Sequence, residues 1–117
     1  MKQWIAFIAM LALATRADAK HGHEPVAIDA GGLHFEAPNA GAAGIVNVTD
    51  GQSHAKQWSV VVYRSPIKNK ALEEDVQWIF IVALAIDDKD LVVTDEHARR
   101  FAVDLKTHHV RALPKRP

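Results

Sequence analysis

Trp78-Ile79-Phe80-Ile81-Val82-Ala83-Leu84-Ala85-Ile86 is the longest uninterrupted apolar run after the first twenty residues, and it decides the fold. Bulky side chains alternate with smaller ones along it, and the run ends in the polar cluster Asp87-Asp88-Lys89-Asp90. Alternation at period two is typical of a β-strand, and such a polar cluster is typical of a turn. We therefore predict a strand over 78–86. Because it is apolar on both faces, we expect it to be central and covered by a second layer or by a partner protein.

Three shorter strand-like runs follow at residues 91–94, 99–105 and 109–113, separated by turn-like segments at 95–98 and 106–107. If the last hairpin closes with a two- or four-residue loop, Phe101 and Val103 share a face with Val110 and Ala112. The same pairing, carried back across 95–98 with a four-residue turn, places Val92 on the Phe101 face. The opposite face then receives the following residues: Leu84, Ile86, Leu91 and Val93.

Upstream of the apolar run, residues 45–48 and 58–64 are rich in β-branched and aromatic residues and are bounded by Asp50-Gly51 and Ser65-Pro66. This punctuation is typical of strands. Residues 20–44 are rich in Gly, Ala, Pro and Asn and predict a loop-rich N-terminal segment with short edge strands. Residues 45–117 form the predicted β-domain core. The expected fold is mainly β, a small antiparallel sandwich or barrel with a C-terminal β-meander.

Residues 1–19 have the pattern of a cleaved signal peptide. Lys2 gives a positive start, residues 4–14 are apolar but too short to span a bilayer, and Ala17-Asp18-Ala19 has small residues at both positions that signal peptidase reads. The mature chain is expected to begin at Lys20 and to be periplasmic or secreted. No stable membrane anchor is expected after cleavage.

The composition excludes several classes of protein. The chain has no cysteine, and both methionines, Met1 and Met10, lie in the leader. Disulfides, iron–sulfur clusters, Cys-based zinc sites and blue-copper centres are therefore excluded. Acidic and basic residues number 14 each, and the leader holds two basic and one acidic residue, which leaves 12 basic and 13 acidic. This balance gives no electrostatic footprint for nucleic acid.

The mature amino terminus, Lys20-His21-Gly22-His23, is the one candidate metal site in the sequence. The α-amine of Lys20 together with the backbone amide and imidazole of His21 can chelate Cu(II), with His23 or water completing a square. Nickel and zinc are the other candidate ions. The competing interpretation is a solvated tail in which two histidines lie close together by chance.

No motif of a catalytic nucleophile, of a phosphate-binding loop or of His-Glu-x-x-His is present, which predicts a protein that is not an enzyme. We expect an exported accessory or stabilising module that binds a protein partner through apolar surface, with self-association as a further option. The alternative is a periplasmic metal-binding protein that uses Lys20, His21 and His23.

Overall fold

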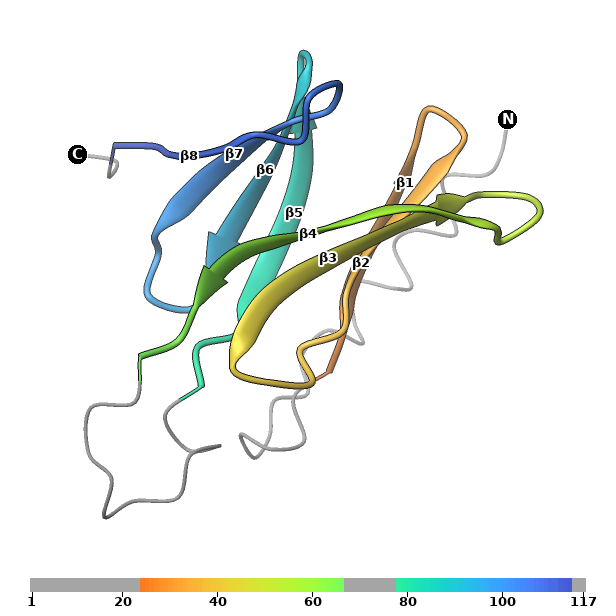
Figure 1. Cartoon of the computed structure of the whole chain (residues 1–117). Coiled ribbons are helices and arrows are strands. Elements are labelled where there is room, and N and C mark those ends of the chain that lie inside the picture. The colour runs from red at the N-terminus through yellow and green to blue at the C-terminus, as the bar shows by residue number, and fades with distance from the viewer. Residues whose placement is uncertain (1–23, 67–77, 115–117) are drawn as a thin grey trace, which may run out of the picture.

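The computed structural model describes residues 24–66 and 78–114, which form two antiparallel four-stranded sheets (Figure 1). These residues contain no helix, and the prediction of a mainly β fold is confirmed. The strands are β1 (Val26–Ala30), β2 (Leu33–Ala37), β3 (Ala43–Asp50), β4 (Lys56–Arg64), β5 (Ile81–Asp87), β6 (Asp90–Asp95), β7 (Arg100–Asp104) and β8 (Val110–Ala112). The predicted signal peptide lies outside the described residues.

Each sheet is a meander, because the strand orders are β1-β2-β3-β4 and β5-β6-β7-β8. The two orders describe separate layers, which fits a sandwich rather than one closed sheet. The β1–β2 hairpin turns at Gly31 and Gly32, whose φ angles are 58° and 79°. Glycine adopts such left-handed conformations without steric cost, and two of them in succession suit a two-residue hairpin.

The first sheet separates an apolar face from a polar one. Phe35 pairs with Val48, and Val48 pairs with Trp58, which makes an inner row across β2, β3 and β4. The next row, shifted by one residue, is polar and includes Asn47 and Ser59, whose hydroxyl donates to the Asn47 side chain at 2.9 Å. This alternation is what a sheet buried on one face requires.

The second sheet confirms part of the predicted register. Phe101 pairs with Ala112 and Val103 with Val110, as a four-residue β7–β8 loop requires. Across β6 and β7 the prediction was wrong by one residue, because Val93 and not Val92 pairs with Phe101.

A three-residue loop causes the shift between β6 and β7. The Asp95 amide donates to the Arg99 carbonyl at 3.0 Å, so only the residues between them form the loop, and Ala98 closes it with a φ of 65°. A left-handed residue at the end of a three-residue loop is a common hairpin geometry. A slip of one residue exchanges the two faces of a strand relative to its partner, so Leu91 and Val93, rather than Val92, share the inner face with Val103 and the partly buried Phe101.

The expectation that the long apolar strand is central is also wrong. β5 begins at Ile81 and is an edge strand of its sheet. Ile81 and Leu84 are buried, whereas Val82 is 44% and Ile86 36% exposed. The strand therefore leaves part of its apolar surface in solvent.

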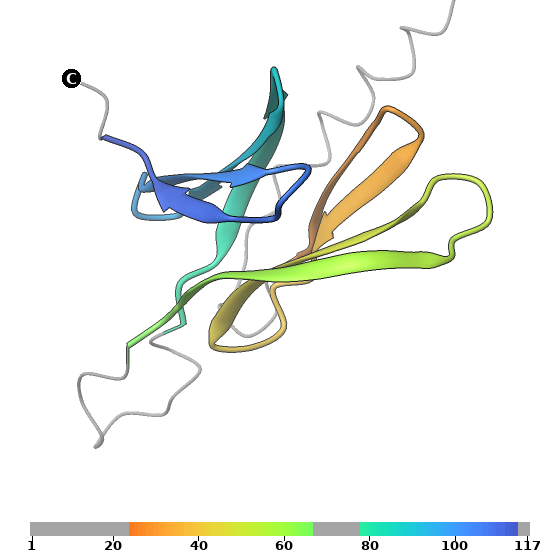
Figure 2. The same ribbon diagram turned by 45° about the horizontal axis from the view of Figure 1, so that its top comes forward.

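The core lies between the sheets, and Figures 1 and 2 show that β3 and β4 cross the strands of the second sheet rather than run alongside them. β1 lies beside β5, so the edges of the two sheets are neighbours. The core residues are Phe35, Ala37, Val46, Val48, Val62, Ile81, Leu84, Leu91, Val93 and Val103. Burial of these side chains is the main source of stability in a chain without disulfides.

Candidate binding surface

An apolar pocket of about 240 Å³ opens between the two sheets at their hairpin ends. Its walls come from four separate parts of the chain: Ala30, Gly31, Leu33, Phe35, Trp58, Ile86 and Leu105. A cavity of roughly 150 Å³ holds a benzene-sized molecule, whereas sites for larger ligands are roughly 300–1,000 Å³. The pocket therefore has room for one ring or one branched side chain, and its lining has no charged group.

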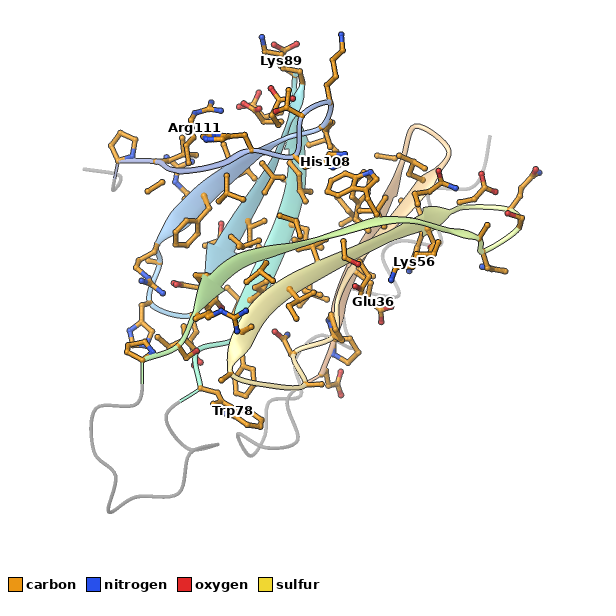
Figure 3. All side chains as sticks on the ribbon, viewed as in Figure 1. Glu36, Lys56, Trp78, Lys89, His108 and Arg111 are labelled. Carbon is orange, nitrogen blue, oxygen red and sulfur yellow. The ribbon has the colours of Figure 1, made fainter. Side chains whose placement is uncertain are left out.

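A stack of two aromatic rings borders the pocket on one side. The Trp58 indole and the His108 imidazole lie 3.7 Å apart between centroids, with an angle of 14° between their planes. His108 comes from the β7–β8 loop and points toward the first sheet, as Figure 3 shows. The stack joins β4 to the second sheet, and the end of β1 and the end of β5 line the same pocket.

The edge of β5 continues from this pocket. Ile86 lines the pocket, and Ala83 and Ala85 on the same strand are exposed. In the β5–β6 hairpin, Asp87 and Asp90 flank a two-residue turn, so Ala85 and Ala83 belong to the hydrogen-bonded pairs with β6. The backbone groups of Leu84 and Ile86 consequently point away from β6. An edge strand of this kind is a template for pairing with another chain.

Asn39 links the sheets at the other end of β5. Its φ is 54°, and its side-chain amide bonds both backbone groups of Ile81, with Oδ1 accepting from the amide at 2.9 Å and Nδ2 donating to the carbonyl at 3.0 Å. Nδ2 also donates to the Glu24 carbonyl at 3.0 Å. The Asn39 side chain therefore makes the two hydrogen bonds to Ile81 that a neighbouring strand would otherwise make. Together with a bulge between Ile81 and Ala83, it occupies this half of the β5 edge.

A buried polar cluster surrounds the loop after β6. Asp95 is 1% exposed, and its carboxylate accepts bonds from the amides of His97 and Arg99 and from Arg99 Nε, the last at 2.6 Å. The Arg99 guanidinium lies over the rings of Tyr63 and Phe101. Each acceptor of Asp95 is used within its own loop, which indicates a structural role for the carboxylate.

Tyr63 connects this cluster to the segment before β5. Its hydroxyl donates to the Ile79 carbonyl at 2.6 Å, and its ring stacks on Phe101 with centroids 5.5 Å apart. Burial, and then the negative charge of Asp95, raise the pKa of the Tyr63 hydroxyl far above its ordinary value. The phenol thus remains protonated and acts as a donor across the accessible pH range.

One loop design occurs in both sheets and was missed by the sequence analysis. The segments Asp50-Gly51-Gln52-Ser53-His54 and Asp104-Leu105-Lys106-Thr107-His108 share the pattern Asp-x-x-Ser/Thr-His. In each, the Asp carboxylate accepts from the amides two and three residues later, and the His is left-handed, with φ of 65° and 68°. The shared pattern is a signal that would have located the β3–β4 and β7–β8 hairpins and the position of His108.

These loops predict a defined acid sensitivity. Hydrogen bonds from backbone amides lower the pKa of both carboxyl groups below 3.8. The largest contribution comes from the Ser53 amide for Asp50 and from the Thr107 amide for Asp104. A pKa lowered by folding stabilises the fold above the unfolded-state value and loses that contribution as the pH falls through the folded-state value. Because asparagine does not titrate, the double variant Asp50→Asn, Asp104→Asn should be less stable than wild type at neutral pH and should lose less stability below about pH 4.

Urea denaturation at a series of pH values measures this difference. Gln57→Ala, an exposed change outside both loops that removes no ionisable group, is the control and should follow the wild-type pH dependence. Parallel curves for the wild type and the double variant would contradict the prediction.

The residues predicted to bind metal, Lys20, His21 and His23, lie outside the described part of the chain. Within residues 24–66 and 78–114, no group of three or more His, Asp or Glu side chains is placed to hold a metal ion. In the same residues, no helix is long and apolar enough to cross a membrane.

Comparisons with protein-family models, with curated proteins and with solved structures gave no match to this chain.

Proposed function

We propose that the protein is an exported, non-catalytic β-domain that binds a protein partner as an accessory or stabilising module. The observation that carries this proposal is the exposure of apolar side chains on the edge strand β5, where Val82 is 44% and Ile86 36% exposed. Ile86 also lines the apolar pocket, and an exposed apolar side chain at such a pocket is typical of a recognition surface. We call Val82, Ile86 and the pocket residues Leu33, Trp58 and Leu105 the β5 surface.

Export is part of the same proposal and rests on the sequence of residues 1–19. The positive start, the short apolar stretch and Ala17-Asp18-Ala19 support cleavage before Lys20 and a periplasmic or secreted product.

Site-specific photocrosslinking tests whether the β5 surface binds a partner. A photoreactive phenylalanine analogue replaces Val82 in one tagged protein and Val61 in a second, because Val61 is a valine of matched exposure, 43%, on the other sheet. We expect adducts with one protein from position 82 and not from position 61, identified by mass spectrometry. The purified partner should bind Val82→Asp at least about tenfold more weakly than wild type and should bind Val61→Asp normally.

Equal adducts from the two positions would contradict the proposal, because the β5 surface would then have no preference. Adducts that contain only a second copy of this chain would replace it with self-association.

A further inference from the structure

The second half of β5 offers two features to one ligand, an unpaired backbone edge and an adjacent pocket. Leu84 and Ile86 direct their backbone groups away from β6, and Ile86 also lines the pocket. The opposite wall is the end of β1, which belongs to the other sheet. Asn39 and the bulge at Val82 occupy the first half of the edge. The free length is therefore Ala83–Ile86.

An extended peptide satisfies both features together. A strand that pairs along an exposed edge gains backbone hydrogen bonds, and every second side chain points to the same face. On β5 that face is the one that carries Leu84 and Ile86, and it leads into the pocket. Since the pocket holds about 240 Å³ and is apolar, it suits one aromatic or branched aliphatic side chain.

The charges at the end of β5 favour a ligand that has a basic residue next to its apolar anchor. Asp87 and Asp88 are exposed and follow Ile86 directly. Lys89 follows them in the same turn, so these three residues carry two carboxylates and one ammonium group. A lysine or arginine next to the apolar anchor of a ligand would therefore meet negative charge at this end.

We propose that the partner contributes an extended segment that pairs with Ala83–Ile86, inserts one aromatic or branched side chain into the pocket and sets a basic residue against Asp87 and Asp88. This binding mode rests on the proposed function and specifies the chemistry of the partner. The segment lies at the pocket, where the end of β1 and the end of β5 form two of the walls.

Binding of labelled synthetic peptides to the purified full chain tests this mode. The probe is Thr-Val-Thr-Phe-Lys-Lys with blocked ends and a fluorescein label, and its affinity is measured by fluorescence anisotropy. We expect saturable binding that becomes at least about tenfold weaker when aspartate replaces the phenylalanine or when alternate backbone amides are N-methylated. Glutamates in place of the lysines should weaken binding several-fold, with a smaller difference at high salt. These three comparisons use the wild-type protein and do not depend on the folding of a variant.

Protein variants locate the site. Ile86→Asp should weaken binding of the phenylalanine peptide at least about tenfold, whereas Val61→Asp, on the other sheet, should leave it unchanged. Equal affinity for the phenylalanine, aspartate and N-methylated peptides would overturn the proposal, as would no binding of any peptide. If position 82 nevertheless crosslinks to a partner, the proposed function stands and only the strand mode fails. If neither experiment shows a preference for the β5 surface, both fail.

Discussion

Replacing Asn39 with alanine should lower the free energy of unfolding by about 3 kcal/mol. Two causes add together. The variant loses three side-chain bonds, two with Ile81 and one with Glu24, which together contribute about 2 kcal/mol. It also places alanine at a φ of 54°, a left-handed conformation that costs an ordinary L-residue about 1–2 kcal/mol and that asparagine tolerates better. Urea or thermal denaturation measures the loss.

A second variant separates the two causes. Asn39→Gly loses the same hydrogen bonds but adopts the left-handed conformation freely, so its stability should lie between those of the wild type and Asn39→Ala. Asn47→Ala is the matched control, because Asn47 bonds Ser59 on the outer face of the first sheet and does not link the two sheets. Equal losses for Asn39→Ala and Asn47→Ala would show that Asn39 does not hold the sheets together.

Gly44→Ala should also be strongly destabilising, again by about 3 kcal/mol. A Cβ atom at position 44 would lie 2.5 Å from two carbons of the Tyr63 ring, so the ring would have to move. Moving the ring disturbs the bond from its hydroxyl to the Ile79 carbonyl and its stacking on Phe101. Overpacking of a buried site costs about 1–3 kcal/mol, and a lost hydrogen bond adds about 1 kcal/mol.

Thermal unfolding should report this change as a fall in Tm of roughly 10–20 °C for a domain of this size. Gly41→Ala is the control, since a Cβ atom there would meet nothing within 4 Å. Adding Tyr63→Val to Gly44→Ala should cost less than the sum of the two single changes, because the smaller side chain removes the clash. A fall in Tm for Gly44→Ala no larger than that for Gly41→Ala would contradict the close packing of Tyr63 on Gly44.

The sequence predicted the strands after residue 44 and the β7–β8 pairing because these follow from local patterns. Alternating polarity marks the strand faces, and Asp50-Gly51 and Ser65-Pro66 mark strand ends. The β6–β7 register could not be predicted in this way. It depends on the left-handed conformation of Ala98, and alanine gives no hint of that conformation because it is usually a residue of helices and extended segments.

The position of β5 at an edge was hidden for a different reason. The sequence does not show whether an apolar residue is buried or exposed to solvent, so Val82 and Ile86 were indistinguishable from core residues. The pocket was hidden as well, because Phe35, Trp58 and Leu105 are distant in sequence and meet only after the sheets pack. His108 was the part of the site with a sequence signal, through the repeated Asp-x-x-Ser/Thr-His pattern.

The two meanders have a consequence for how the chain folds. Every ladder joins strands that are consecutive in sequence, so the loop that must close for each pairing is short and its entropic cost is small. All the pairing partners of the first sheet are available once residue 64 has emerged from the ribosome or from an export channel. Pairing within each sheet can thus precede docking of one sheet on the other, and the contacts made by Asn39 and by Trp58 with His108 belong to that later step.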